Sequence, residues 1–186
     1  MRNGDAQNMK TQVTIRPETV ADVGAIDDIT AAAFRTVAVS NQTEQFIIGA
    51  LRAANALTIS LVAEHEARVV GHVAFSPVTI SDGSKGWYGL GPVSVLPELQ
   101  RQGIGTALIE EGLSLLEGLN AHGCCLVGDP SFCGRIGFRN IPELVHEGVP
   151  PEVFLAKPLR GVVPHGVVAF HEGFKATGPQ EGPGRV

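Results

Sequence analysis

Residues 93–105 have the sequence V-S-V-L-P-E-L-Q-R-Q-G-I-G, and the amphipathic segment T-A-L-I-E-E follows at 106–111. The β-like run stops at Pro97, and a short polar turn leads to two glycines that open a helix. Gly103 and Gly105 allow close approach to the backbone, and a helix start offers unpaired N–H groups at its positive dipole end. This stretch therefore predicts an anion site, most simply for a nucleotide-type pyrophosphate.

The composition is that of a globular chain. Of its 186 residues, 44% are apolar and 18% are charged, which suits one domain with a substantial core. The net charge of −5 gives no basic excess for sequence-independent nucleic-acid binding, so we predict no nucleic-acid partner. No apolar run approaches the roughly 20 residues of a membrane-spanning helix. The first residues also lack the apolar segment of a signal peptide.

The three cysteines indicate neither a disulfide framework nor a metal site. Cys124 and Cys125 are adjacent and would point to opposite faces of a strand, and no Cys/His group has zinc spacing. We therefore expect no metal, and a reducing, cytoplasmic location.

The order of expected elements indicates an α/β chain with a mixed sheet. Strands are expected at 13–16, 57–64, 68–80, 87–96, 124–127, 152–156 and 167–170, and helices at 20–34, 42–54, 103–122 and, briefly, 131–136. An antiparallel meander that feeds a β-α-β crossover predicts helices on both faces of the sheet. We expect a single domain at 11–175, with flexible termini at 1–10 and 176–186.

Two details of these elements can be checked directly. In the long helix, the expected buried stripe consists of Ile104, Leu108, Leu115 and Leu119, and the helix is expected to end at Gly123. Pro92 lies inside a strand but cannot donate to a ladder, so it belongs at an edge, at a bulge, or where two strands part. A parting of strands would form a cleft beside the expected anion site.

These motifs resemble a known family. Q-R-Q-G-I-G at 100–105 is similar to the acyl-CoA pyrophosphate loop of the GNAT N-acetyltransferase superfamily. G-D-P-S-F-C-G-R-I-G-F at 128–138 resembles a segment that reads G-D-P-x-Y-Y-x-R-F-G-F in a bacterial subgroup, as do I-R-P-E-T-V-A-D at 15–22 and F-H-E-G-F at 170–174. The resemblance implies the GNAT fold, a mostly antiparallel sheet with splayed strands. It also implies an acetyl-CoA-dependent N-acetyltransferase in which a small-molecule or peptide primary amine attacks the thioester directly. The sequence leaves the oligomeric state open between a monomer and a homodimer.

The resemblance also implies site residues. The backbone of Val93, Ser94 and Val95 would bind the pantetheine arm next to Phe132, with the Val95 amide as oxyanion donor. The pyrophosphate would be held by Gln100, Arg101, Gln102, Gly103, Ile104, Gly105 and Thr106. Family members often carry a tyrosine as general acid four residues before the glycine of the G-F pair, and here that position is Cys133. Cys133 either assists departure of the thiolate or is a wall residue of the cleft.

The general base is left open by the sequence. Some relatives carry a glutamate on the splayed strand, but this chain has no acidic residue between Asp82 and Glu98. Candidates are Glu44, His72, Asp129 and His171, each of which also has an ordinary structural explanation, and a water chain could serve instead. The missing tyrosine also permits an alternative function, an acyl-CoA-binding sensor or regulatory module with weak or no transfer. A third alternative is an α/β domain without a ligand.

Overall fold

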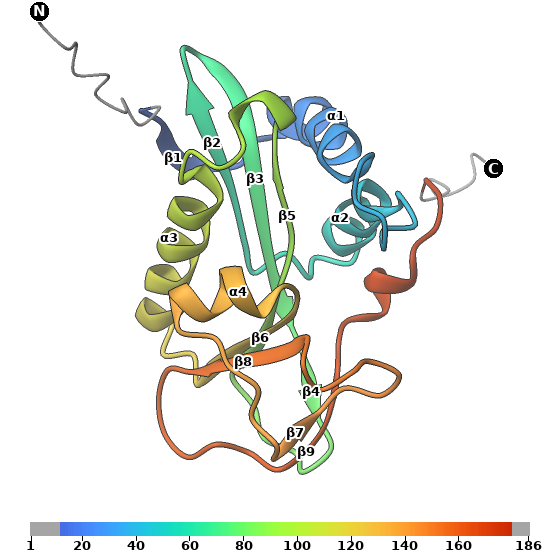
Figure 1. Ribbon diagram of the computed structural model, residues 1–186, viewed down its shortest axis with the longest axis vertical. Coiled ribbons are helices and arrows are strands. Elements are labelled where there is room, and N and C mark those ends of the chain that lie inside the picture. Colours follow the sequence, from blue (N-terminus) through green and yellow to red (C-terminus); the bar gives the residue numbers. More distant parts are fainter. Residues whose placement is uncertain (1–11, 180–186) are drawn as a thin grey trace, which may run out of the picture.

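The computed structural model describes residues 12–179, which form a six-stranded mixed sheet and a smaller sheet (Figure 1). The large sheet has the order β1-β2-β3-β5-β6-β8, and the small sheet the order β4-β9-β7. The strands are β1 (Thr14–Pro17), β2 (Ile59–His65), β3 (Arg68–Pro77), β4 (Thr79–Ile80), β5 (Trp87–Val95), β6 (Gly123–Val127), β7 (Leu144–Val145), β8 (Phe154–Pro158) and β9 (Gly166–Ala169). Only β5 with β6 and β7 with β9 pair in parallel, which confirms the predicted mixed sheet.

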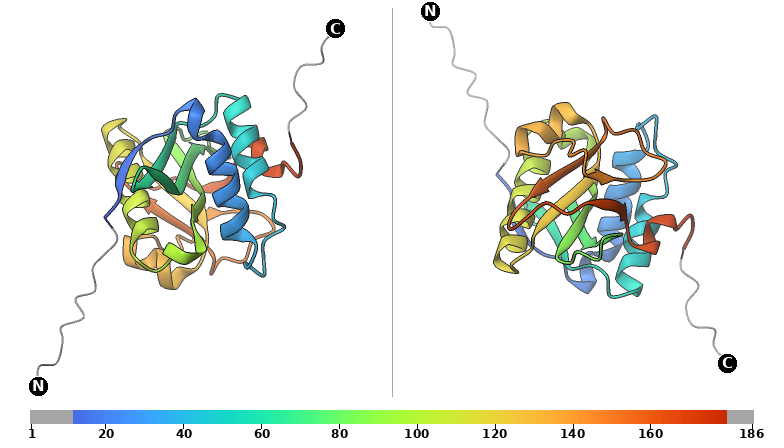
Figure 2. Two further views of the ribbon diagram at one scale, coloured as in Figure 1. Left: turned by 90° about the horizontal axis from the view of Figure 1, so that it is seen from above. Right: turned by 90° about the horizontal axis from the view of Figure 1, so that it is seen from below.

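Helices cover both faces of the large sheet, as predicted (Figure 2). α1 (Val23–Phe34) and α2 (Glu44–Ala53) lie on one face, and α3 (Ile104–Gly118) lies on the other. α4 (Pro130–Cys133) continues into a 3₁₀ turn at Gly134–Ile136, and further 3₁₀ turns lie at Val20–Asp22, Pro97–Leu99 and Glu172–Lys175. The expected termini at 1–10 and from 180 onward fall outside the described residues.

The buried face of α3 differs in part from the prediction. Ile104 and Leu108 are buried, but Leu115 and Leu119 are 40% and 56% exposed. The stripe in contact with the sheet follows Leu108, Gly112 and Leu116 at four-residue spacing, which leaves Leu115 at its margin and Leu119 beyond the helix end. The helix stops at Gly118, so Gly123 opens β6 and does not end the helix.

Close packing explains why a glycine lies in the middle of that stripe. A Cβ atom on Gly112 would overlap the ring of Phe75 on β3, which is fully buried. α3 therefore approaches the sheet more closely than a helix with a side chain there could. This fixes the start of α3 at the end of β5, where the predicted anion site lies.

Cys124 and Cys125 fall on opposite faces of β6, as predicted, and pack into two different core clusters. All three cysteines are free thiols. The small sheet, with β7 and the pairing of β4 to β9, was not anticipated. The expected strand at 152–156 is also shifted, since β8 spans Phe154–Pro158.

Candidate active site

Strands β5 and β6 part in the middle of the large sheet. They pair only where Trp87–Gly89 faces Gly123–Cys125, and beyond Gly89 the two strands are no longer paired. The pairing of β5 with β3 becomes irregular at the same place, between Val73 and Phe75. Pro92 falls within this irregular stretch, so its missing N–H breaks no ladder. Of the three positions considered for Pro92, the structure shows two together, a bulge against β3 and a parting from β6.

Two backbone amides of β5 face the gap. The Leu96 N–H donates to Val70 O at 2.9 Å, so Leu96 faces β3. Because successive residues of a strand point their backbone groups in alternating directions, the amides of Val95 and Val93 face away from β3, toward the gap. The Val95 carbonyl on that side accepts a hydrogen bond of 3.0 Å from the Gln100 side chain.

The gap leads to the start of α3. Gly103, the residue before this helix, has φ = 87°, a left-handed conformation that glycine adopts without strain. The first α-helical hydrogen bond runs from Ala107 N to Gly103 O at 2.9 Å. The amides of Ile104, Gly105 and Thr106 precede that bond and therefore have no acceptor within the helix. They lie at the positive end of the helix dipole, as an anion site requires.

Gly105 has no intramolecular reason to be glycine. Its φ is not left-handed, and a Cβ atom there would meet only Val95 Cγ2, at the ordinary contact distance of 3.8 Å. The space above this turn is thus left open by the rest of the described chain. Room for a ligand against the backbone explains the residue.

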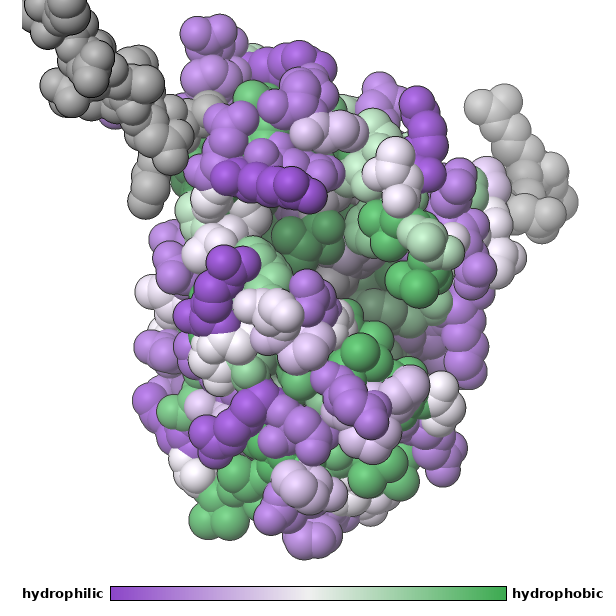
Figure 3. Space-filling view, in the orientation of Figure 1, coloured by the Kyte–Doolittle hydropathy of each residue, from purple (hydrophilic) through white to green (hydrophobic). Residues whose placement is uncertain are grey.

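A cavity of about 780 Å³ lies beside the gap between β5 and β6. Figure 3 shows the molecule hollowed on this face, with hydrophobic residues inside the hollow and hydrophilic ones around it. The walls include parts of α1, α2, β5, α4 and β9, the end of β6, and the segments that follow β7 and β9. They are mostly apolar and include Phe34, Ile47, Leu90, Val93, Val127, Phe132, Val167, Phe170 and Phe174.

Two acidic residues predicted from the sequence lie on this cavity. Glu44 Oε1 accepts a hydrogen bond of 2.6 Å from the Ser40 hydroxyl, and its Oε2 is buried with no partner among the described residues. Asp129 precedes α4, and its Oδ1 accepts from the Ser131 amide at 2.8 Å. Asp129 therefore caps α4 through one oxygen, and Glu44 keeps a buried oxygen available to a cation.

Cys133 lies in the cavity wall but is a weak acid. Its side chain is 5% exposed, and burial, reinforced by the charge of Asp129, raises the pKa of the thiol to about 11. An ordinary alkyl thiol has a pKa of about 8.5, so proton transfer from Cys133 to a leaving thiolate would be unfavourable by roughly two orders of magnitude.

Ser94 and His72 point away from the cleft. The Ser94 hydroxyl is hydrogen-bonded to the Thr30 hydroxyl of α1 at 3.1 Å, and Ser94 pairs with His72 of β3. The His72 side chain is fully buried and is not part of the cavity wall. Burial lowers the pKa of His72, against the opposing charge of Glu18, so the imidazole is neutral there. Neither side chain is placed to act on a substrate in the cavity.

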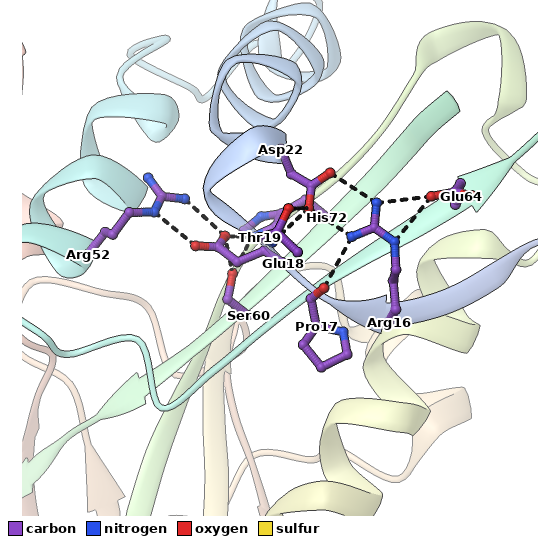
Figure 4. A network of polar contacts seen from close by, with 9 residues as sticks. All are labelled: Arg16, Pro17, Glu18, Thr19, Asp22, Arg52, Ser60, Glu64 and His72. Atoms are coloured by element: carbon purple, nitrogen blue, oxygen red, sulfur yellow. Dashed lines mark hydrogen bonds and ion pairs between the residues drawn. The ribbon is translucent and has the colours of Figure 1, made fainter. Parts of the chain in front are cut away.

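His72 belongs instead to a polar network that joins the helices to the sheet (Figure 4). Glu18 bonds Arg52 of α2 at 2.9 Å and Ser60 of β2, and its Oε2 lies 3.5 Å from His72 Nε2. Although burial works in the other direction, hydrogen bonds from His72, Arg52 and Ser60 hold the pKa of Glu18 well below its usual range. A second group joins Arg16 to Asp22 and Glu64. The network fixes α2, which carries Glu44, against the sheet.

Two histidines from the late part of the chain also line the cavity. His171 was among the predicted base candidates, whereas His146 was not. His146 follows the short strand β7, which no local pattern indicates. Only the pairing of β7 with β9 brings it to the cavity.

The chain belongs to the GNAT acetyltransferase family, because residues 25–131 match the model of the Acetyltransferase (GNAT) family. The predicted class, an acetyl-CoA-dependent acyltransferase, is thereby confirmed. The chain is similar to the Escherichia coli K12 protein named "Uncharacterized N-acetyltransferase YhbS", with 34% identity over 126 residues that cover 67% of this chain and 72% of that protein.

Two solved structures are similar over nearly their whole length. A GNAT family acetyltransferase from Brucella melitensis in complex with acetyl-CoA has 48% identity and a TM-score of 0.78, covering 88% of this chain and 99% of that one. YhbS from E. coli in complex with CoA has 28% identity and a TM-score of 0.80, covering 96% and 98%. The predicted GNAT fold is therefore also confirmed.

Within residues 12–179, no three His, Cys, Asp or Glu side chains are grouped so that they could hold a metal ion. None of the helices in that range has the length and apolar character needed to cross a bilayer.

Proposed function

We propose that this protein transfers the acetyl group of acetyl-CoA directly to a primary amine of a small molecule or peptide. One observation carries the proposal: the gap between β5 and β6 connects the start of α3 with the apolar cavity. An elongated substrate with an anionic end and an uncharged reactive end fits such a path. The complexes of the two similar proteins with acetyl-CoA and CoA support the assignment.

The turn before α3 would hold the pyrophosphate. The amides of Ile104, Gly105 and Thr106 are placed to donate to it, with Gln100, Arg101, Gln102 and Gly103 forming the turn below. The Gln100 side chain contributes indirectly, because its bond to the Val95 carbonyl ties the turn to β5.

The amides of Val93 and Val95 would bond the pantetheine arm and the thioester. Val93 lies on the cavity wall and Val95 does not. We therefore assign the thioester carbonyl to the Val93 amide and the pantetheine to Val95. The oxyanion donor thus lies two residues earlier in β5 than the Val95 amide assigned from the sequence. Negative charge develops on the carbonyl oxygen during attack, and one fixed N–H there contributes about 3 kcal/mol to catalysis. Phe132 lies on the same wall.

The amine would enter through the cavity. Its ammonium form is attracted by Glu44, whose buried Oε2 has no other partner among the described residues. Cys133 is too weak an acid to assist departure of the thiolate much, but a thiolate is a tolerable leaving group without protonation. The three free thiols suit a reducing compartment, so we place the protein in the cytoplasm.

Calorimetry with CoA, followed by a thiol-release assay with acetyl-CoA, tests this function. The amines would be spermidine, lysine, phenethylamine and a peptide with a free N-terminus. We expect CoA binding and release of CoA thiol with at least one amine. Binding without turnover on any of them would favour the alternative of an acyl-CoA sensor, and no binding would exclude both.

A further inference from the structure

His146 lies where the two strands begin to part. Its ring meets Phe170 edge-on, with centroids 4.9 Å apart, and is tilted against Phe154 at 5.5 Å. The Phe170 ring lies against Gly89, the last residue of β5 that pairs with β6, because a Cβ there would overlap it. Phe154 pairs with Val127 at the end of β6. The imidazole is thus held between a ring that packs on Gly89 of β5 and a ring of β8 that is paired with the end of β6, on the wall of the cavity.

The hydrogen bonds of His146 determine which ring nitrogen carries the proton. Nδ1 lies 2.9 Å from the carbonyl oxygen of Val168 on β9. A carbonyl oxygen only accepts, so Nδ1 must be the N–H donor. In the neutral ring Nε2 then carries a lone pair, and it has no hydrogen-bond partner within residues 12–179. His146 is therefore held in the tautomer that can accept a proton at Nε2.

The other histidine on the cavity is held in the opposite tautomer. His171 Nδ1 accepts a hydrogen bond of 3.0 Å from the Gly173 amide. An accepting Nδ1 has no hydrogen, so Nε2 of neutral His171 bears the proton and can only donate. The two carboxylates are each held through one oxygen, Asp129 Oδ1 by the Ser131 amide and Glu44 Oε1 by the Ser40 hydroxyl. Imidazole is in general a stronger base than a carboxylate.

We propose that His146 is the general base of this enzyme, a role that rests on the proposed transfer to an amine. The acceptor ammonium gives one proton to His146 Nε2, and the freed lone pair forms the C–N bond to the acetyl carbon. The C–S bond then breaks and its electron pair stays on sulfur. A second proton from the attacking nitrogen neutralises the thiolate, while His146 returns its proton to water. The Val168 carbonyl stabilises the imidazolium through the Nδ1 hydrogen.

The tautomers can be observed without any acceptor. Long-range ¹H–¹⁵N NMR of the full chain at neutral pH should show His146 protonated at Nδ1 and His171 at Nε2. Signals are assigned from His146→Asn and His171→Asn. A hydrogen on Nε2 of neutral His146 would overturn the proposal whatever the enzyme's substrate.

Turnover provides the second test. Asparagine at position 146 can still donate to Val168 O but cannot take up a proton, so we expect kcat/KM at pH 7 to fall about 10²- to 10⁴-fold in His146→Asn. The limb of the pH profile that reports base deprotonation should disappear. The other titratable groups on the cavity wall are the same in the wild type and the variant; they are Glu44, Asp129, Cys133, Glu147, His171 and Lys175.

Controls separate this role from folding and from the proposed function. His146→Ala should bind CoA like the wild type and regain activity with added imidazole, a rescue that a purely structural residue would not show. His165→Gln, at an exposed histidine outside the cavity, should keep the wild-type pH profile. A wild-type profile in His146→Asn would refute the base while leaving acetyl transfer intact. Wild-type protein inactive on all four amines would refute both.

Discussion

Replacing Gly105 by alanine should make the protein more stable and weaken its binding of CoA. Gly105 is the second residue of α3, and a Cβ there meets only Val95 Cγ2, at 3.8 Å. Alanine is favoured over glycine inside a helix by about 0.5–1 kcal/mol, somewhat less in the first turn. For a chain of this size that corresponds to a Tm increase of about 1–4 °C. The gain arises because nothing in the folded chain opposes the methyl group.

The same methyl group should obstruct the anion. Cβ atoms of a helix point toward its N-terminus, which here is the place proposed for the pyrophosphate. We expect Kd for CoA to rise at least ~10-fold, or ~1.4 kcal/mol. Calorimetry would measure Kd, and differential scanning calorimetry without ligand would measure Tm. Gly24→Ala is the matched control, since Gly24 is the second residue of α1 and its Cβ would have no neighbour within 4 Å. An unchanged Kd for Gly105→Ala would refute the placement of the pyrophosphate.

Three further outcomes are expected. Cys133→Ser should keep most of the wild-type kcat, because a thiol with its pKa raised to about 11 contributes little as an acid; an inactive variant that still binds CoA would contradict this. Gly112→Ala should lower the free energy of unfolding by about 1–3 kcal/mol, because the added methyl group overlaps Phe75. Gly118→Ala should not lower it, because the Cβ position there is open. Equal urea midpoints for the two variants would disprove the packing argument. Glu18→Gln should be destabilised at pH 7 by about 1–3 kcal/mol, and the difference from the wild type should shrink as pH falls below ~4. A carboxylate whose pKa is lowered by folding stabilises the fold above its unfolded pKa and loses that effect as it is protonated. A difference independent of pH would contradict the assignment.

The parts predicted from sequence are those that short-range chemistry determines. The left-handed backbone at Gly103 favours glycine, and Pro92 cannot lie in an unbroken ladder of strand hydrogen bonds. Each residue type therefore indicates its local backbone structure without knowledge of the rest of the chain. The parting of strands and the helix start followed from these two positions. The family resemblance then joined them into one site.

The parts that were missed depend on contacts between distant segments. His146 acquires its tautomer from Val168, 22 residues further along, and its place from a two-residue strand. Leu115 satisfies a helical period as well as Leu116 does, and only the close approach of α3 at Gly112 decides which of them is buried. Ser94 alternates with its neighbours in β5, so naming three successive residues as ligands overlooked that the middle one faces the other way.

The parting of β5 from β6 leaves an unpaired strand edge in the middle of the large sheet. The Val93 and Val95 amides face no acceptor within residues 12–179, so without substrate they are left to water, and their hydrogens should exchange with solvent faster than that of Leu96, which is bonded to Val70. A substrate lying along the gap would act as a missing strand and slow the exchange of both. The exchange rates of these two amide hydrogens would therefore report, residue by residue, whether the gap between β5 and β6 is occupied.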